Sequence, residues 1–594
     1  MNLQKAFSAL PLATFFLAPP TPALAQKPNV IFILTDDQGY GDLGCHGNPW
    51  IKTPNLDKLH SESVRFTNFH TGTTCSPTRS GIMTGKYCNK VGVWHTLNGR
   101  EILAAEETTL AQTMKKAGYH TAIFGKWHLG DNYPFRPQDR GFDEVLVHGG
   151  GGVGQQPDYW NNDYFDDTYF RNGKPEKFTG NCTDVWFSEA IKFIKTNKNL
   201  PFFCFLSTNA PHDPWEVEKK YSEPYENNPG IPNPNFYGMI TLIDENVGKL
   251  RQELERLGIA ENTILVFMTD NGTMGGVKFG NSGELISGFN AGMRGVKSSP
   301  YDGGHRVPFF INWPKEGISA GKDIANITSY IDFMPTLLDL CGVKPASKMD
   351  GISLKPLIYG NKANWPARIL FTDTQREEFL KKWKQFAAMT DRWRLVGKDE
   401  LYDMTSDPGQ KANVAAKHPE VVGKLLGEYE KWWRDVSQNA DKYACIKVGT
   451  PNENPVCLHS MDFHTEKGMP AWSQEQLRAA VGENGFWAIE IANAGSYEIE
   501  LCRWPKESGL KMNDTAPAVE KMAGVIHYAV GKALNIKEAR IKIGEQEKIA
   551  EVKPEQTSVK FTLKLKAGKT TLETWLKDDQ GVQRGAYYTY IGKK

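Results

Sequence analysis

The sequence lacks three features that would narrow its function at once: a large net charge, a long apolar run and a rich set of cysteines. Its 70 basic and 69 acidic residues leave a formal charge of +1, which gives no reason to expect nucleic acid or an acidic membrane surface as partner. No segment reaches the roughly 18 apolar residues of a membrane span. We therefore expect no nucleic acid partner and no membrane anchor, and any anion must be recognised locally.

Cysteine is scarce, with nine in 594 residues, and the number is odd. Disulfides are compatible with export, but the spacing shows no framework. Only Cys445 and Cys457 are close enough in sequence to suggest a disulfide that closes a small loop. An odd count also fits one cysteine being used for something other than a disulfide.

The N-terminus has the pattern of a signal peptide. Lys5 is the only charge in residues 1–25, residues 6–17 are mostly apolar, and Ala23-Leu24-Ala25 is a small-residue cleavage pattern. A short membrane anchor is the alternative, but the run is short and broken by prolines. We predict a signal peptide at 1–25 and an exported protein, periplasmic or secreted.

Buried strands alternate with helices through the first two thirds of the chain. Continuous apolar runs indicate strands buried on both faces, and helical patterns lie between them; the runs are 29–35, 119–124, 201–206 and 263–268, and two such helices are 110–117 and 239–257. This alternation predicts an α/β fold, a mixed and mostly parallel sheet flanked by helices. Ligands of such sheets bind beyond the carboxyl ends of the strands, where polar residues follow these runs.

The pattern changes after about residue 370. Short strands at 393–396 and 400–403 precede a helix at 419–436, and from about 480 period-2 segments between turns suggest an antiparallel β-sandwich. We predict three domains after the signal peptide: a main α/β domain at 26–370, a small α+β subdomain at 371–460 and an accessory β-rich domain at 461–594.

The segment around Cys75 carries the strongest chemical signal. Pro77 suits the first turn of a helix that runs toward Tyr87, which places Cys75 at a helix N-terminus, where backbone N–H groups favour an anion. We expect a depressed pKa for this thiol. From the residues alone, a thiolate nucleophile, a redox thiol and a structural cysteine all remain open.

Two pairs of residues with side-chain oxygen donors follow two of the predicted strands. Asp36 and Asp37 follow the first run, and Asp270 and Asn271 follow the run at 263–268. Three carboxylates and an amide are hard oxygen donors that suit Ca²⁺ or Mg²⁺ rather than zinc. Asn271-Gly272-Thr273 also matches a glycosylation acceptor, which we discount because a metal ligand should not carry a glycan.

The run Cys75-Ser76-Pro77-Thr78-Arg79, followed by Ser80-Gly81, resembles the signature of type I sulfatases (arylsulfatases), formylglycine-dependent members of the alkaline phosphatase-like superfamily. The resemblance covers roughly residues 28–435 and continues through Asp36-Asp37, Gly125-Lys126-Trp127-His128, His212, Asp270-Asn271-Gly272 and Lys297. It implies that Cys75 is oxidised to formylglycine (3-oxoalanine) before folding. The partner would be a formylglycine-generating enzyme or an anaerobic sulfatase-maturating enzyme, which reads the linear motif.

The resemblance also implies roles for the other residues. One Ca²⁺ would be held by residue 75 and by the four oxygen donors, Asp36, Asp37, Asp270 and Asn271. Three cations would surround the sulfate, Arg79, Lys126 and Lys297. His128 would orient or deprotonate the formylglycine hydrate, and His212 would be a candidate general acid at the leaving group, with Lys297 beside it. For three further histidines, His46, His148 and His305, we expect structural or substrate-facing roles.

One departure from the family concerns the loop after Lys297. This chain has Ser298-Ser299 there, where relatives commonly have glycine directly after the lysine. Lys297 itself is retained. The departure puts the shape of the loop after it in question.

The implied mechanism, as a hypothesis, uses both hydroxyls of the hydrate. One attacks sulfur and the alcohol leaves; the other is then deprotonated and expels sulfate, which regenerates the aldehyde. The chain is thus predicted to be a sulfatase, a sulfuric ester hydrolase.

A glycine run at 148–154 precedes aromatic, Asn and Asp residues at 157–167, which can stack on and bond sugars or simply form a packed loop. We expect a sulfated sugar or polysaccharide as substrate, as in similar bacterial polysaccharide sulfatases. The alternatives are a phosphonate monoester or phosphodiester hydrolase on the same fold, and a non-catalytic glycan-binding protein if Cys75 stays unmodified.

Overall fold

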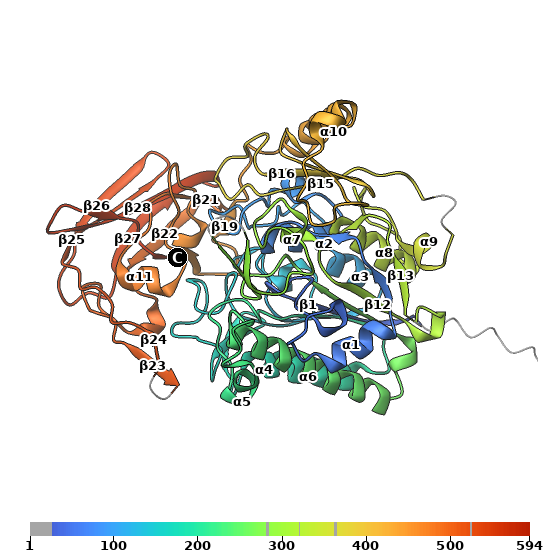
Figure 1. Ribbon diagram of the computed structural model, residues 1–594. Helices are drawn as coiled ribbons and strands as arrows, with labels where there is room; N and C mark the ends of the chain where they lie inside the picture. Colours follow the sequence, from blue (N-terminus) through green and yellow to red (C-terminus); the bar gives the residue numbers. More distant parts are fainter. Residues whose placement is uncertain (1–26, 281–283, 320, 362–364, 523–524) are drawn as a thin grey trace, which may run out of the picture.

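A computed structural model describes residues 27–280, 284–319, 321–361, 365–522 and 525–594, so the predicted signal peptide at 1–25 lies outside the described residues. A large α/β unit lies beside a β-rich C-terminal region (Figure 1). Among the helices of the described residues, none has the length and apolarity needed to cross a membrane.

The α/β unit is built on one mixed sheet of ten strands in the order β13-β2-β12-β9-β1-β8-β4-β5-β6-β7. The five strands from β9 to β5 run parallel, which confirms the predicted fold class. In sheet order the strands are Lys322–Ile324, Val64–Phe66, Phe309–Asn312, Thr263–Thr269, Asn29–Thr35, Phe202–Ser207, His120–Gly125, Glu144–Val147, Thr168–Arg171 and Lys174–Lys177.

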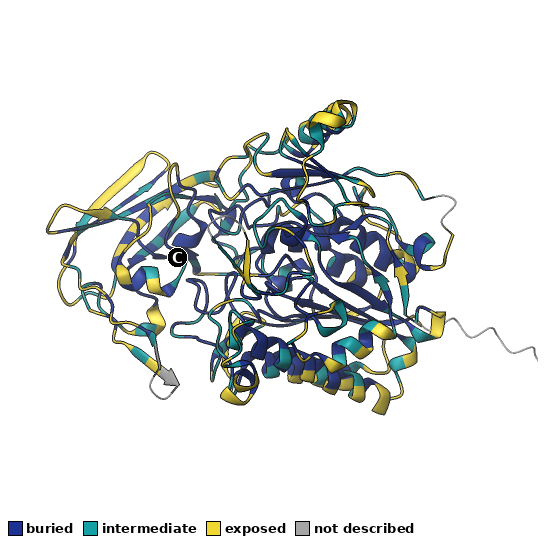
Figure 2. Cartoon of the chain, viewed as in Figure 1, coloured by how far each residue is buried: buried dark blue, intermediate teal, exposed yellow. Residues whose placement is uncertain are grey.

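Both faces of the central strands of this sheet are buried, as the continuous apolar runs predicted. Along β1, Val30, Phe32 and Leu34 enter one core while Ile31 and Ile33 enter the other. Figures 1 and 2 show helices on both sides with their sheet-facing surfaces buried. One face is covered by α2 (Cys75–Thr84), α3 (Leu110–Lys116) and α8 (Phe333–Leu340). The other is covered by α1 (Pro54–Ser61), α4 (Cys182–Asn197) and α6 (Pro234–Arg256).

Side-chain caps fix where several of these helices begin. The Asn181 and Asn233 side chains accept backbone N–H groups in the first turns of α4 and α6, and Thr109 forms a capping box with Gln112 at α3. These caps satisfy N–H groups that the helices themselves leave unpaired.

A small antiparallel sheet of four strands follows: β15 (Leu370–Asp373), β16 (Phe386–Met389), β17 (Trp393–Val396) and β18 (Glu400–Asp403). The helix α10 (Pro419–Val436) packs against it and has the bounds that the sequence predicts. A buried ion pair ties this sheet to the α/β unit, with Arg394 Nε 2.9 Å from Asp302 Oδ1.

The C-terminal region consists mainly of two antiparallel-rich sheets around a separate core. One sheet runs β19 (Ile446–Val448), β21 (Phe486–Ile491), β28 (Gly568–Asp578), β25 (Ile536–Ile543) and β26 (Gln546–Glu551), with β29 (Gln583–Arg584) pairing to β28. The other runs β20 (Val456–His459), β30 (Tyr588–Lys593), β22 (Gly495–Cys502) and β27 (Val559–Leu565). Because β19 and β20 precede residue 461 and join these sheets, we propose that this unit reaches back to about residue 446.

The remaining elements are short. They are β3 (Phe69–His70), β14 (Thr328–Ser329), β10 (Val277–Phe279), β11 (Leu285–Gly288), β23 (Val519–Met522), β24 (Val525–Tyr528), α5 (Lys219–Ser222), α7 (Asp302–His305), α9 (Lys355–Ile358) and α11 (Gln474–Ala479).

The predicted disulfide between Cys445 and Cys457 is wrong, because both residues are free thiols. The Cys445 thiol lies near the Tyr443 carbonyl, and the Cys457 sulfur lies 3.6 Å from His459 Nε2. Closeness in sequence did not bring the two sulfurs together.

Candidate active site

Side chains from two strand ends and from one helix N-terminus meet at the carboxyl edge of the sheet. Asp36 and Asp37 follow β1, Asp270 follows β9, and Cys75 is the first residue of α2. The Cys75 sulfur and one carboxylate oxygen of each aspartate all lie within 4.8 Å of one another. All four residues are buried, with at most 2% of their surface exposed. The structure therefore brings distant predicted residues into one compact group.

The donors implied for a metal ion fit a hard cation. Asn271 donates from Nδ2 to Asp37 Oδ1 at 2.9 Å, while its Oδ1 is buried without a hydrogen-bond partner. A buried amide oxygen without a partner is costly. Beside three carboxylates, such an oxygen matches the all-oxygen donor set of Ca²⁺.

The buried carboxyls differ in acidity. Burial and the neighbouring Asp36 raise the pKa of Asp270 to about 7. Burial also acts to raise the pKa of Asp36, but the charges of Lys126, His212, Arg79 and Lys297 outweigh it and hold that pKa well below its usual range. Asp36 is therefore the firmly ionised member of the group.

Three cations balance the three carboxylates. Lys126 pairs with Asp36, and Lys297 Nζ lies 2.6 Å from Asp37 Oδ1. Burial acts to lower the pKa of Lys297, but the charges of Asp37 and its neighbours, with the hydrogen bond to Asp37, together outweigh burial and raise that pKa. The three cations are held in place before any ligand binds, in a site shielded from water that can hold an anion.

Arg79 spans the floor of the site. Its Nη2 lies 2.9 Å from Asp270 Oδ2 and its Nη1 donates to Ser207 Oγ at 2.6 Å. Sequence analysis did not single out Ser207, although it directly follows the predicted strand at 201–206, which is where site residues were expected. These two contacts hold the buried guanidinium of Arg79 in one orientation.

The prediction of a depressed pKa for Cys75 is wrong. Burial, and next the negative charge of Asp36, raise the pKa of its thiol to about 12. Its sulfur donates to Asp36 Oδ1 at 3.3 Å. The position at the start of α2 was predicted correctly, but a buried thiol beside a carboxylate stays protonated. Unmodified Cys75 is thus a poor thiolate nucleophile.

The two predicted histidines have opposite character. His128 is bonded through Nε2 to the Thr96 carbonyl at 3.0 Å, and its Nδ1 is buried without a partner. Burial and Lys126 hold the pKa of His128 well below its usual range. If Nε2 carries the proton, Nδ1 is a free acceptor.

His212 lies between two aspartates, with its Nε2 3.7 Å from Asp37 Oδ2 and its Nδ1 3.0 Å from Asp213 Oδ1. Burial acts to lower its pKa, but the charges of Asp37 and Asp36 and the hydrogen bond to Asp213 together outweigh burial and raise the pKa of His212. Sequence analysis missed Asp213, and its position directly after His212 is the signal that could have indicated it. His212 is the better proton donor of the two.

Three residues of the site have a left-handed backbone conformation. Asp37, His128 and Ser298 have φ of 62°, 58° and 69°, a region that side chains other than glycine rarely adopt. Ser298 therefore keeps a left-handed turn after Lys297 where relatives commonly have glycine. Gly125, at φ 109°, allows a close approach, because a Cβ there would lie 1.9 Å from the Ser207 carbonyl oxygen.

The glycine-rich segment at 148–167 is a packed loop. A Cβ on Gly151 would lie 2.1 Å from the His128 ring, and Tyr164 donates its hydroxyl to the His212 carbonyl at 2.6 Å. On its other side, Gln156 donates its backbone N–H to the Trp472 carbonyl at 2.8 Å. The loop thus connects both site histidines to the C-terminal region.

A cavity of about 480 Å³ lies between this loop and the C-terminal region. Aromatic and acidic side chains line it, among them Tyr159, Phe170, Tyr590, Asp158 and Glu453. His148 lines it as well, while His305 bonds His70, with their Nδ1 atoms 2.9 Å apart. Aromatic rings with hydroxyl-binding carboxyls are a common lining for carbohydrate.

Comparison with known proteins gives matches to two family models and to curated relatives. The family model described as Sulfatase matches residues 28–343, and the model described as N-sulphoglucosamine sulphohydrolase, C-terminal, matches residues 297–431. An N-acetylgalactosamine-6-sulfatase of Rattus norvegicus is 33% identical over 359 residues, 56% of this chain and 66% of that protein. An N-acetylgalactosamine-6-O-sulfatase of Bacteroides thetaiotaomicron is 28% identical over 499 residues, 68% of this chain and 92% of that protein.

Among solved structures, Ps i-CgsB is 28% identical with a TM-score of 0.63, and the match covers 70% of this chain and 95% of that one. The same protein has been solved in complex with k-i-k-neocarrahexaose, with a TM-score of 0.61 to this chain. The two family models together match residues 28–431 and do not extend into the C-terminal β-rich region.

Proposed function

This chain belongs to the sulfatase family, and from that premise we propose that it removes sulfate from a sulfated carbohydrate by means of a formylglycine at position 75 and one bound Ca²⁺. Hydrolysis of sulfuric esters follows from the family itself. The formylglycine, the calcium ion and the sugar are the proposed parts.

The observation that carries the proposal is the group formed by Cys75 and three carboxylates, all within 4.8 Å, beside the unpartnered Asn271 Oδ1. Asp36, Asp37, Asp270 and Asn271 would hold the ion, which would supply positive charge next to residue 75. No thiolate chemistry suits this environment, because burial and Asp36 keep the pKa of the thiol at about 12.

A formylglycine hydrate at position 75 would supply two hydroxyls on one carbon, one to attack sulfur and one to allow sulfate to leave. Because Cys75 is 2% exposed in the folded chain, a maturating enzyme has no access to it after folding. We therefore propose that a formylglycine-generating enzyme or an anaerobic sulfatase-maturating enzyme acts on the unfolded chain, in keeping with an exported, periplasmic or secreted protein.

The cations bind and orient the sulfate group. Arg79 is fixed by Asp270 and Ser207 at the base of the site, and Lys126 and Lys297 are each paired with an aspartate of the group. Fixed positive groups of this kind stabilise charge that develops on sulfate oxygens without having to reorganise.

His128 and His212 have different roles in proton transfer. Neutral His128 presents Nδ1 as an acceptor for a proton of the hydrate, while its Nε2 stays on the Thr96 carbonyl. His212, held by Asp213, presents Nε2 on the side of Asp37 and Lys297 and would donate a proton to the departing alcohol oxygen.

A sulfated sugar is the proposed substrate because the named relatives act on sulfated amino sugars and the solved relative was captured with an oligosaccharide. The aromatic and acidic cavity beside the loop at 148–167 would accommodate further sugar units.

The test combines mass spectrometry with turnover. Purified, calcium-loaded protein should show the Cys75 peptide at the lower mass of the aldehyde and should release sulfate from one or more defined sulfated mono- or oligosaccharides. Cys75→Ala should abolish release. Turnover retained in Cys75→Ala would contradict the proposal, as would a phosphodiester or phosphonate ester cleaved faster than every sulfate ester.

A further inference from the structure

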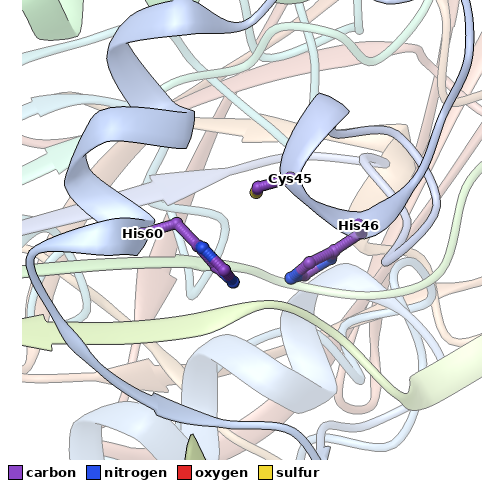
Figure 3. A group of neighbouring side chains, drawn as sticks. All are labelled: Cys45, His46 and His60. Carbon is purple, nitrogen blue, oxygen red and sulfur yellow. The ribbon is translucent and has the colours of Figure 1, made fainter. Parts of the chain in front are cut away.

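We propose that Cys45, His46 and His60 form a second metal site, separate from the calcium site, that binds Zn²⁺ or a similarly soft ion. The three residues lie in the 3-10 helix η1 (Gly44–His46) and in α1, and none belongs to the catalytic group. Figure 3 shows the two imidazole rings pointing toward each other, with the Cys45 side chain beside the space between them.

The donor geometry suits a small tetrahedral ion. One donor atom from each residue lies within 4.8 Å of the other two. Tetrahedral zinc, with bonds of about 2.0 to 2.3 Å, needs donors about 3.5 Å apart. All three residues are half-buried, so modest side-chain rotations close that difference and solvent can supply a fourth ligand.

The contacts of His46 orient its imidazole as a metal ligand. The Nδ1 of His46 lies 2.7 Å from the Tyr40 carbonyl oxygen, and an N–H donated there leaves Nε2 with its lone pair free. A backbone carbonyl in this role is the usual second partner of a metal-bound histidine. The ring also stacks on Tyr40, with centroids 3.8 Å apart, which fixes its plane.

Both histidines are neutral at physiological pH, as ligands must be. Burial lowers the pKa of His46 to about 3, and burial followed by Arg65 lowers the pKa of His60. Arg65 Nη1 donates toward His60 Nδ1 at 3.4 Å, which favours a proton on Nε2. Zinc binding through Nε2 would therefore require the proton to move to Nδ1, with Arg65 kept on its other partners, the His60 and Gly321 carbonyls. The ligand set of one sulfur and two nitrogens excludes Ca²⁺ and Mg²⁺, which require oxygen.

Local charge permits a divalent ion. Arg65 is neutralised by Asp323, whose Oδ1 lies 2.6 Å from its Nε. Asp57 accepts the Cys45 backbone N–H at 2.8 Å and contributes a negative charge beside the thiol. Burial and the charge of Asp57 raise the pKa of the Cys45 thiol, so the thiol is protonated without a metal. Zinc binding would displace that proton to solvent, and the thiolate and Asp57 would together offset the charge of the ion. Arg306, which stacks over Tyr40, is the other cation nearby.

The experiment uses the full-length, matured, calcium-loaded enzyme, with Zn²⁺ alone as the probe. After incubation and desalting, bound zinc is counted by elemental analysis, and alkylation of Cys45 by iodoacetamide is followed by peptide mass spectrometry. Wild type should retain about one equivalent of zinc more than Cys45→Ser or His60→Gln, and zinc should slow Cys45 alkylation by on the order of tenfold.

His60→Gln keeps the thiol, so it should lose both the zinc and the protection even if Cys45→Ser folds poorly. Matched controls are Cys445→Ser and His418→Gln, a thiol and an imidazole of similar exposure elsewhere, which should behave as wild type. Ca²⁺ and Mg²⁺ should give no protection. Equal zinc in all variants, or alkylation of Cys45 that zinc does not slow, would overturn the proposal.

Discussion

Replacing Asp462 by asparagine should raise the free energy of unfolding above pH 6 and leave it unchanged near pH 4. Asp462 ends a 3-10 helix (Ser460–Asp462) in the C-terminal region and is 5% exposed; its carboxyl contacts Glu101 of the α/β unit, which is 1% exposed. Burial raises the pKa of Asp462 to about 6, and burial followed by Asp462 raises the pKa of Glu101 well above its usual range.

The sign and size of this change in the free energy of unfolding follow from the linkage between proton binding and folding. Asp462 binds a proton more tightly in the folded state than in the unfolded state, where its pKa is about 4. Its stabilising contribution is therefore complete below about pH 4 and is lost as the pH rises through about 6. Two pKa units correspond to about 3 kcal/mol. The amide introduced by D462N never ionises and can still accept a hydrogen bond from protonated Glu101, so the variant avoids that loss.

The assay is equilibrium urea denaturation at pH 4, 6 and 8 with tryptophan fluorescence. Wild type and D462N should have similar free energies of unfolding at pH 4, and the variant should be more stable by up to about 3 kcal/mol at pH 8. Glu106→Gln, which removes an exposed carboxylate a few residues from Glu101, is the control and should follow wild type. A D462N curve parallel to wild type at all three pH values would refute this reasoning.

Three further predictions concern the catalytic site. Arg79→Lys should lower sulfate-ester turnover by on the order of 100-fold, because lysine cannot contact Asp270 and Ser207 at once; steady-state kinetics on protein with full conversion of residue 75 tests this, and unchanged kcat would contradict it. Gly125→Ala should lower the free energy of unfolding by more than about 1 kcal/mol, measured by urea denaturation, because its Cβ would meet the Ser207 carbonyl; equal stability would show that the strand ends can separate. Chelation of calcium should abolish turnover while the mass of the residue-75 peptide stays that of the aldehyde, and added Ca²⁺ should restore it; turnover that persists after chelation would argue against a metal at Asp36 and Asp270.

The sequence alone determined the architecture well where periodicity was unbroken. The run at 29–35 predicted a strand buried on both faces, and β1 sends alternate residues into two cores. The helix at 419–436 was predicted with its observed bounds, because proline marks its start and an apolar stripe runs along its length. Such signals are local, and tertiary packing only reinforces them.

Properties that depend on long-range packing were missed or predicted wrongly. The helix N-terminus at Cys75 suggested a thiolate, but burial and Asp36, 39 residues away in the sequence, decide its protonation. The loop at 148–167 could be exposed or packed on sequence grounds, and the contact of Gln156 with Trp472 decides for packing. No periodicity encodes such contacts between segments hundreds of residues apart.

The balanced composition of the chain conceals a cluster of buried charges of both signs at the active site. Three buried carboxylates, Asp36, Asp37 and Asp270, face three buried or half-buried cations, Arg79, Lys126 and Lys297. These formal charges cancel, so the protein part of the site attracts an anion weakly. The proposed Ca²⁺ would add two positive charges, which match the two negative charges of departing sulfate. Metal loading, rather than the net charge of +1, would therefore control whether a sulfate ester binds.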